Sequence, residues 1–182
     1  MDMNRRTIKL QEALQAASAH AMRRSHQGID VEHLVIALLE QQNGIAGSLL
    51  EHAGVSPSAV EKAAQQALAK ISQVHGPGAA PGQLHMTSRL SQILVQAEQE
   101  MQGLKDDYLS VEHVILVMVE EGGLFKNLSI TRAKLLSALQ QVRGNQRVDS
   151  QNPEGSYQAL EKYGRDLTQL ASQGKLDPVI GR

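Results

Sequence analysis

Two Glu-His pairs, Glu32-His33 and Glu112-His113, come closest to a chemical site in this sequence by residue type and spacing. Each pair follows a valine at a predicted helix start, and imidazole and carboxylate groups are common metal ligands. A metal-binding His-Glu-x-x-His motif needs two histidines one helical turn apart, and neither pair is followed by the second one. We therefore interpret both imidazoles as groups that form local hydrogen bonds and pack at the helix starts, and we predict no metal site.

The remaining acidic candidates are the pair Asp106-Asp107 and Glu112, which flank one loop-to-helix junction. Neighbouring carboxylates can serve acid–base catalysis only where a cleft shifts their pKa values. The sequence favours the alternative, which is a solvated turn followed by a helix cap. The other five histidines are scattered and receive no role: His20, His26, His52, His75 and His85.

Motifs for nucleophilic or nucleotide chemistry are missing from the sequence. It has no Cys, which removes thiolate chemistry and disulfides. The single Gly-Lys pair, Gly174-Lys175, is followed by Leu176, and Gln169 stands where a phosphate-binding loop requires its first Gly. A Gly-x-Ser-x-Gly elbow is also absent. We expect no catalytic residue in these 182 residues, no enzyme activity, and no bound cofactor.

The composition argues against nucleic acid and membrane as partners. The formal net charge is −1, so no overall field attracts phosphates or acidic lipids. One Phe, three Tyr and no Trp leave few side chains on which bases could stack. The N-terminal residues run directly into an amphipathic pattern without the apolar core of a signal peptide, so we expect a cytoplasmic location.

The elements that position the Glu-His pairs are two copies of one apolar helix, at residues 31–40 and 111–120. Asp30 and Ser110 precede the copies and are suited to cap the free N–H groups of the first turn. Glu32 and Glu112 place negative charge near the positive end of each helix dipole. The apolar blocks have little polar interruption, so both helices are predicted to be buried nearly all round.

The duplication extends along most of the chain. The central helices lie 80 positions apart, and the same difference relates upstream pairs such as Thr7 and Thr87. Beyond the central helix the difference becomes 75, as between Val60 and Leu135, which implies a deletion of five residues in the second copy. One register followed by one deletion is typical of a true internal repeat.

Apolar spacing and helix breaks predict an all-α fold of two pseudo-repeats with about four helices each, at about residues 5–75 and 86–144. No window alternates in the manner of a strand. The Gly- and Pro-rich stretch 76–82 is predicted to link the repeats. The polar stretch 145–156 is predicted to be a second linker, which leaves the domain.

Three stretches together resemble one family. The duplicated Val-Glu-His helix and the linker at 76–82 resemble the Clp N-terminal domain, and residues 152–168 resemble the ClpB type within that family. Residues 174–182 are similar to the entry into the first AAA+ module of these unfoldases. The resemblance covers the whole chain, and implies a duplicated N-terminal domain at 1–144, a linker at 145–156 and the truncated start of the AAA+ module at 157–182.

The resemblance implies that the domain captures unfolded or aggregated polypeptide in a shallow apolar groove and passes it to the pore of a hexamer. The full-length disaggregase would be an AAA+ ATPase that uses ATP and magnesium and works with a DnaK-type chaperone, whereas this chain alone would be a monomer. The family's substrate-binding positions match Thr7, Asp106 and Glu112. Two apolar positions of the groove match Leu94 and Val114.

Each of these assignments has a structural alternative. Thr7 and Glu112 are also a helix cap and a first-turn acid, and Thr87 and Glu32 repeat them in the other copy. Leu94 and Val114 have the spacing of core residues as well as that of a groove. The alternative function is an adaptor-docking domain like those of the proteolytic Clp unfoldases, and the ClpB-like linker argues against it.

Overall fold

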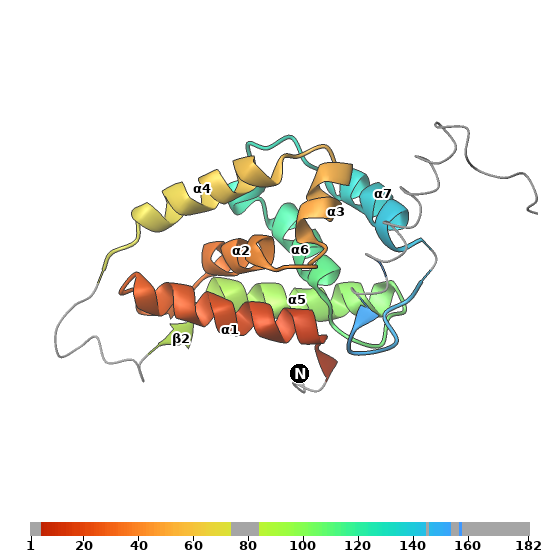
Figure 1. The fold of residues 1–182 in the computed structure, drawn as a ribbon, viewed down its shortest axis with the longest axis horizontal. Helices are drawn as coiled ribbons and strands as arrows, with labels where there is room; N and C mark the ends of the chain where they lie inside the picture. The colour runs from red at the N-terminus through yellow and green to blue at the C-terminus, as the bar shows by residue number, and fades with distance from the viewer. Residues whose placement is uncertain (1–4, 74–83, 145, 154–156, 158–182) are drawn as a thin grey trace, which may run out of the picture.

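The computed structural model describes residues 5–73, 84–144, 146–153 and 157, and within them the fold is all-α (Figure 1). The predicted architecture of two repeats with about four helices each is confirmed, although the third element of the second repeat is a 3-10 helix. The first repeat contains α1 (Ile8–Arg23), α2 (Val31–Glu40), α3 (Ala46–His52) and α4 (Pro57–Ala69). The second contains α5 (Ser88–Gly103), α6 (Val111–Glu121), η4 (Gly123–Phe125) and α7 (Arg132–Arg143).

The expectation of no strands is wrong in one detail. Two-residue strands β1 (Gly28–Ile29) and β2 (His85–Met86) pair in parallel, with Ile29 opposite Met86. An isolated bridge joins Arg6 to Leu109, and these positions are Met86 minus 80 and Ile29 plus 80. Each repeat therefore lays the residues before its first helix against the residues before the other repeat's central helix. A two-residue strand is too short to show an alternating pattern in the sequence.

The two repeats interlock through their later helices. Within each repeat the first helix packs on the central one, and the last helix packs on the central one as well. Across the repeats, α3 packs on α7 and α4 packs on η4, which makes η4 the counterpart of α3. The buried apolar residues form one hydrophobic cluster that draws on both repeats. The halves consequently share one core.

The central helices are buried as predicted. Every residue from Val31 to Leu38 and from Val111 to Val119 is buried. Capping is also confirmed: the Nδ1 atoms of His33 and His113 accept the backbone N–H of Asp30 and Ser110, each at 2.9 Å. These imidazoles therefore take the place of the glutamate that accepts the N-cap N–H in the usual capping box.

The segment 146–153, which belongs to the predicted linker at 145–156, packs on the domain. The Asp107 N–H donates to the carbonyl of Val148 at 2.7 Å, and the Ile8 N–H donates to the carbonyl of Gln151 at 2.8 Å. The Val148 side chain is fully buried. One apolar side chain and backbone pairing hold this otherwise polar segment on the domain.

The inter-repeat linker at 76–82 lies outside the described residues, and so does the predicted AAA+ start apart from Tyr157. Tyr157 is fully buried. Among the helices that the structure describes, none combines the length and the apolar character that crossing a bilayer requires.

Candidate functional site

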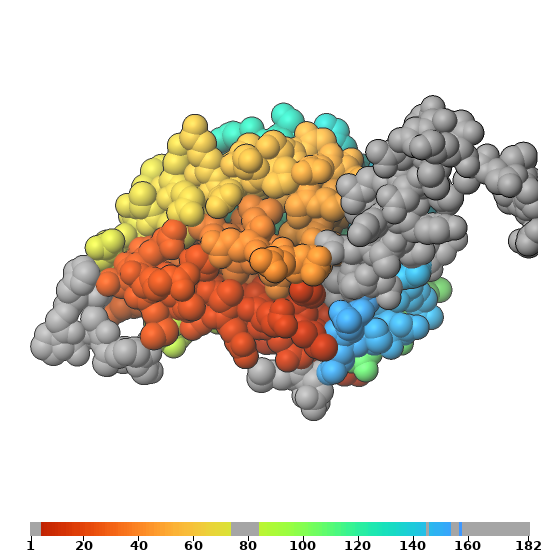
Figure 2. Space-filling view, in the orientation of Figure 1, coloured from red at the N-terminus to blue at the C-terminus, as the bar shows by residue number. Residues whose placement is uncertain are grey.

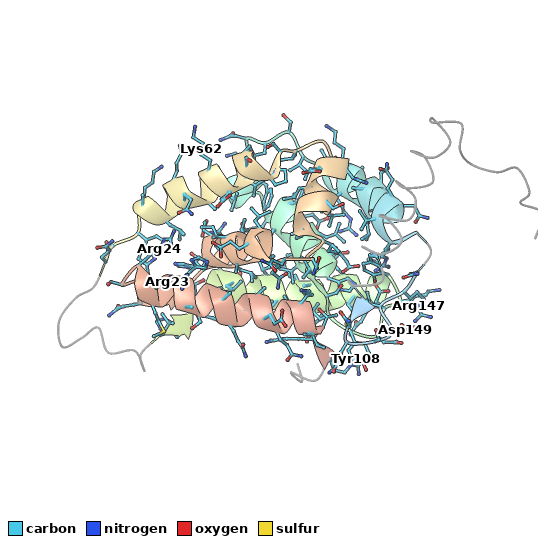
Figure 3. The ribbon with its side chains drawn as sticks, in the orientation of Figure 1. Arg23, Arg24, Lys62, Tyr108, Arg147 and Asp149 are labelled. Carbon is cyan, nitrogen blue, oxygen red and sulfur yellow. The ribbon has the colours of Figure 1, made fainter. Side chains whose placement is uncertain are left out.

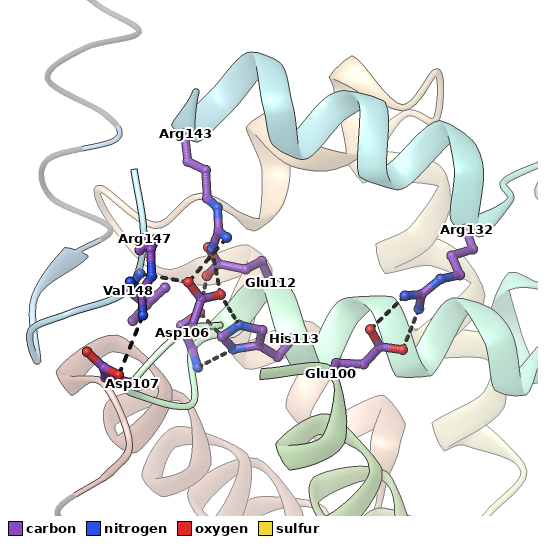
Figure 4. A network of polar contacts seen from close by, with 10 residues as sticks. Glu100, Asp106, Asp107, Glu112, His113, Arg132, Arg143, Arg147 and Val148 are labelled. Carbon is purple, nitrogen blue, oxygen red and sulfur yellow. Dashed lines mark hydrogen bonds and ion pairs between the residues drawn. The ribbon is translucent and has the colours of Figure 1, made fainter. Parts of the chain in front are cut away.

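A buried charged network lies at the start of α6 (Figure 4). Asp106 comes from the loop after α5, Glu112 and His113 from the first turn of α6, and Arg143 from the end of α7. All four are at most 7% exposed. The predicted solvated turn is therefore wrong for Asp106 and right for Asp107, whose side chain is 58% exposed. Glu112 lies in the first turn of α6 as predicted, but it is buried.

The guanidinium of Arg143 bridges the two carboxylates. Its Nη1 lies 3.0 Å from Oδ2 of Asp106 and 3.1 Å from Oε2 of Glu112. The Val148 N–H donates to Oδ1 of Asp106 at 2.9 Å. Because Nδ1 of His113 already accepts an N–H, the ring proton sits on Nε2 and is donated to Oδ2 of Asp106 at 2.8 Å. Three segments of the chain thus converge on the carboxylate of Asp106.

These contacts determine the charge of Asp106. Burial acts to raise its pKa, but hydrogen bonds from His113, Val148 and Arg143 outweigh burial, and the pKa lies below its ordinary value. Burial acts in the opposite sense to lower the pKa of Arg143, and the carboxylates of Glu112 and Asp106 raise it above the ordinary value. Both groups are therefore charged at neutral pH.

Such a network is suited to holding chain segments together rather than to catalysis. The Ser110 hydroxyl donates to the second oxygen of Glu112, so both of its carboxylate oxygens are engaged. The four side chains are at most 7% exposed and engage one another, so a substrate atom would have to displace their present partners to reach them. Among the residues that the structure describes, no group of three or more metal-ligating side chains is assembled.

The equivalent place in the first repeat has different chemistry. Subtracting 80 from Asp106 and His113 gives His26 and His33, whose Nδ1 and Nε2 atoms lie 2.9 Å apart. Burial, and then the neighbouring His26, lower the pKa of His33 to about 4. Subtracting 75 from Arg143 gives Leu68, so this copy has no bridging cation.

The predicted substrate-binding residues are all buried. Thr7, Glu112 and Val114 are fully buried, Asp106 is 5% exposed and Leu94 is 6% exposed. The structure brings Asp106 and Glu112 together through Arg143. Leu94 and Val114 belong to the hydrophobic core.

Thr7 caps α1, because its Oγ1 accepts the N–H of Leu10 at 3.3 Å. Its own N–H donates to the carbonyl of Leu109 at 2.9 Å, so Thr7 lies beside the chain that connects Asp106 to Glu112. The N-cap role of Thr7 is confirmed, whereas a role of the five residues in substrate binding stays a prediction.

A small apolar pocket lies between the central helices and was not anticipated from the sequence. Its lining includes Val35 and Leu38 of α2, together with their repeat equivalents Ile115 and Met118 of α6. The other lining residues are also apolar: Leu39, Ala46, Leu50 and Phe125. Its volume is about 10 Å³, which is room for one water molecule. The apolar end of each central helix was visible in the sequence, but their juxtaposition was not.

Arg143 was also missed, although the sequence held a signal. The repeat alignment places it opposite Leu68, on the face of the last helix that carries buried residues. A cation at such a position predicts a buried carboxylate partner. The nearby acidic residues Asp106 and Glu112 were the obvious candidates.

Comparison with known proteins matches residues 5–129 to the Clp repeat N-terminal domain family. The chaperone protein ClpB of Bacillus cereus is 49% identical over 186 residues, an alignment that spans 100% of this chain and 22% of that protein. The chain therefore spans about a fifth of the length of such relatives.

Two solved structures show the same fold. The N-terminal domain of Hsp104 from Candida albicans has a TM-score of 0.70 at 20% identity, over 82% of this chain and 98% of that one. The N-domain of ClpV in complex with a VipB peptide has a TM-score of 0.57 at 18% identity, over 75% and 85% of the two chains. At these identities the likeness concerns the fold alone.

Proposed function

This chain belongs to the Clp N-terminal domain family, and from that premise we propose that it captures unfolded or aggregated polypeptide for a ClpB-type disaggregase. The full-length protein would then be a cytoplasmic hexameric AAA+ ATPase that uses ATP and magnesium. It would thread the captured chain through its central pore in cooperation with a DnaK-type chaperone. The similarity to ClpB chaperones over the whole chain supports this proposal.

The observation that carries the proposal is the apolar pocket between α2 and α6. Its lining is apolar throughout and lies where the two repeats meet. Unfolded polypeptides differ from folded ones by exposing apolar side chains, and a pocket of this kind selects for that difference without reading a particular sequence. Leu39, which is half-buried, marks the solvent side of the pocket.

The expected affinity is low. Burying one aliphatic side chain yields about 1.5–3 kcal/mol. The pocket must widen to accept such a side chain because it holds only about 10 Å³, and an extended chain loses conformational freedom when it docks. Dissociation constants between micromolar and millimolar are therefore expected, which suits a domain that must release its substrate to a pore.

The five predicted binding residues have an indirect role in this proposal. Because Thr7, Asp106, Glu112, Leu94 and Val114 are buried, a docked chain reaches them only if the surrounding segments move. Their contribution would otherwise be to fix α5 and α6 in the positions that form the apolar pocket.

Adaptor docking is the second candidate function. The ClpV N-domain has been solved with a bound VipB peptide, so a domain of this fold can hold a defined peptide. A folded adaptor would need a larger surface than the apolar pocket, since specific protein interfaces bury roughly 800 Å² per partner. The two candidates therefore differ in the extent of the surface that changes on binding.

A titration followed by nuclear magnetic resonance tests the proposal. The ligand is a permanently unfolded polypeptide rich in apolar residues and without acidic side chains. We expect chemical-shift changes centred on Leu39, Met118 and Phe125, and weaker binding by Leu39→Gln. The matched control is Leu136→Gln, which changes a half-buried leucine of α7 outside the pocket.

The outcome separates the candidates. Equal binding by Leu39→Gln and Leu136→Gln, or no shift at millimolar ligand, would exclude substrate capture in this pocket. Adaptor docking would then become the leading candidate.

A further inference from the structure

A second pocket, of about 230 Å³, opens in the first repeat between the ends of α1 and α4. Figure 2 shows these two helices meeting on one face of the molecule, and Arg24 at the end of α1 donates to Gln65 of α4 at 2.6 Å. The pocket is lined by Arg24, His26, Gln65, Leu68, Ala69, Ile71 and Gln73.

The second repeat contains the same place, and there it is filled. Adding 75 to Leu68 and Gln73 gives Arg143 and Val148. The Arg143 guanidinium and the Val148 backbone both contact Asp106, and Asp106 is the counterpart of His26. The protein's own chain therefore occupies this place in one repeat, and the other repeat leaves it open.

The occupant of the filled copy is an extended piece of polypeptide. Val148 donates its N–H to the Asp106 carboxylate, and its carbonyl accepts the N–H of Asp107. Its side chain is fully buried and belongs to the hydrophobic core. The site geometry thus suits one residue of an extended chain, held by a polar contact beside an apolar one.

In the open copy His26 offers a hydrogen-bond donor at the place where Asp106 offers an acceptor in the filled copy. The Nδ1 of His33 accepts the Asp30 N–H, so the His33 proton sits on Nε2 and is donated to Nδ1 of His26. The neutral His26 ring must therefore carry its own proton on Nε2. His26 is only 5% exposed, and among the described residues no hydrogen bond from this Nε2 is recorded.

The charge around the pocket also favours a negatively charged hydrogen-bond acceptor as the ligand. Arg24 supplies a guanidinium to the lining, and the lining contains no carboxylate. Figure 3 labels Arg23 and Arg24 at the end of α1 and Lys62 on α4. Of the acidic side chains near this end of α1, Glu40 is engaged by Nε2 of His20 at 2.7 Å.

We propose that this pocket binds an aspartate or glutamate side chain of an extended polypeptide, with His26 and Arg24 donating to the carboxylate and Leu68 and Ile71 packing against a neighbouring apolar residue. The inference rests on the proposed function and adds to it a second subsite, selective for acidic residues. A substrate with an acidic residue near an apolar cluster would then bind more tightly than the apolar cluster alone.

Two matched peptides test the subsite directly. One carries a single aspartate among apolar and neutral residues in a sequence without proline, and the other replaces that aspartate by asparagine. A charge-assisted hydrogen bond is about twice as strong as a neutral one, so we expect the aspartate peptide to bind about tenfold more tightly. Shifts specific to it should centre on Arg24, His26 and Gln65.

Three variants of the full chain sharpen the test, one of them a control. Arg24→Gln should reduce the preference for the aspartate peptide to about twofold or less, whereas Lys62→Gln, which removes an exposed cation outside the lining, should retain it. Ala69→Glu, at an exposed lining position, should abolish the preference because it places a competing carboxylate beside Arg24.

The results distinguish this subsite from the apolar pocket. Equal affinities for the two peptides, with shifts confined to Leu39, Met118 and Phe125, would overturn the acidic subsite and leave the proposed function intact. A preference for aspartate that survives both Arg24→Gln and Ala69→Glu would place the contact elsewhere and also overturn it. No binding of either peptide at millimolar concentration would count against both.

Discussion

Ser25 and Lys105 are repeat equivalents, and both have a left-handed backbone, with φ of 57° and 60°. The next residue is His26 in the first repeat and Asp106 in the second, and each contacts the imidazole that caps the following central helix. The backbone and the cap are thus the same in both copies. The exchange of this imidazole for a carboxylate is accompanied by the exchange of Leu68 for Arg143.

The residue that follows this turn determines whether the space beside it is filled by the chain or remains a pocket. A buried carboxylate requires compensation, and Asp106 obtains it from Arg143 and from the backbone of Val148. A neutral imidazole has no charge to compensate: Nδ1 of His26 accepts the proton of His33, and the Nε2–H remains available on the side of the pocket that His26 lines. The charged copy therefore recruits the chain after α7, and the neutral copy retains a pocket.

The acidic residues in the first turns of the two central helices also differ in their ion-pair partners. Glu112 is paired with Arg143 of its own repeat at 3.1 Å. Glu32 is paired at 2.8 Å with Arg89, which comes from the other repeat and also binds Glu121. One acid thus fastens its repeat internally, and the other fastens the two repeats to each other.

The largest expected effect comes from making the second copy resemble the first at its last helix. Arg143→Leu introduces the residue that the first repeat has at this position and leaves Asp106 and Glu112 buried without a cation. Removing one partner of a buried ion pair typically costs about 3–5 kcal/mol of unfolding free energy. Urea denaturation of the variant measures the loss.

A control on the same helix isolates burial as the cause. Arg132 pairs with Glu100 and Glu120 but is 36% exposed at its side chain, so Arg132→Leu should cost at most about 1 kcal/mol. Similar losses for the two variants would contradict the view that the Arg143 network differs from a surface ion pair.

The pH dependence of stability separates the two copies. The folded pKa of His33 is about 4, below the unfolded value of about 6.5, so the unfolded state binds more protons between these values. Stability should therefore fall by about 3 kcal/mol as the pH drops from about 6.5 to about 4. His33→Gln should flatten this limb, because Gln can still reach back to the cap but does not titrate.

The second copy should respond at lower pH. The pKa of Asp106 is depressed in the folded state, so its contribution is present above the unfolded value of about 3.9 and is lost as the pH falls below it. Asp106→Asn should weaken the dependence below about pH 4 and leave the limb above it unchanged. Loss of the upper limb in Asp106→Asn would mean that the two copies do not titrate independently.

Much of the fold could be predicted from the sequence because its signals are local or repeated. The caps Thr7, Asp30 and Ser110 and the apolar blocks fixed the helix starts, and the constant difference of 80 revealed the duplication. The short pairing of Ile29 with Met86 has no local signal, because it depends on how the repeats are placed relative to each other.

The candidate site was harder to predict for the same reason. The buried state of Asp106 depends on Arg143, 37 positions away, and on Val148. A polar stretch of sequence around Val148 is typical of a linker, and only the folded arrangement shows that its backbone satisfies a buried carboxylate. The pocket beside His26 was hard to predict for a similar reason. It is present because Leu68 stands where the other copy has the cation Arg143.

The smallest expected effect concerns the caps that the two copies share. Thr7 and Thr87 each accept an N–H from the third residue of their helix, at 3.3 Å and 3.2 Å. Thr7→Ala and Thr87→Ala should each cost about 1 kcal/mol of unfolding free energy, and Thr7→Ser should restore most of it because Ser keeps the hydroxyl.

This pair of variants also decides what Thr7 contributes to binding. Thr7 is fully buried, so its hydroxyl can affect a docked polypeptide only through the position of α1. Thr7→Ala should then bind the unfolded polypeptide within about twofold of the original chain, as should Thr87→Ala, since an intact pocket retains its apolar burial. A clear loss of affinity in Thr7→Ala alone, at equal stability, would assign that hydroxyl a direct contact with substrate. It would also mean that the segment around Thr7 opens when polypeptide binds.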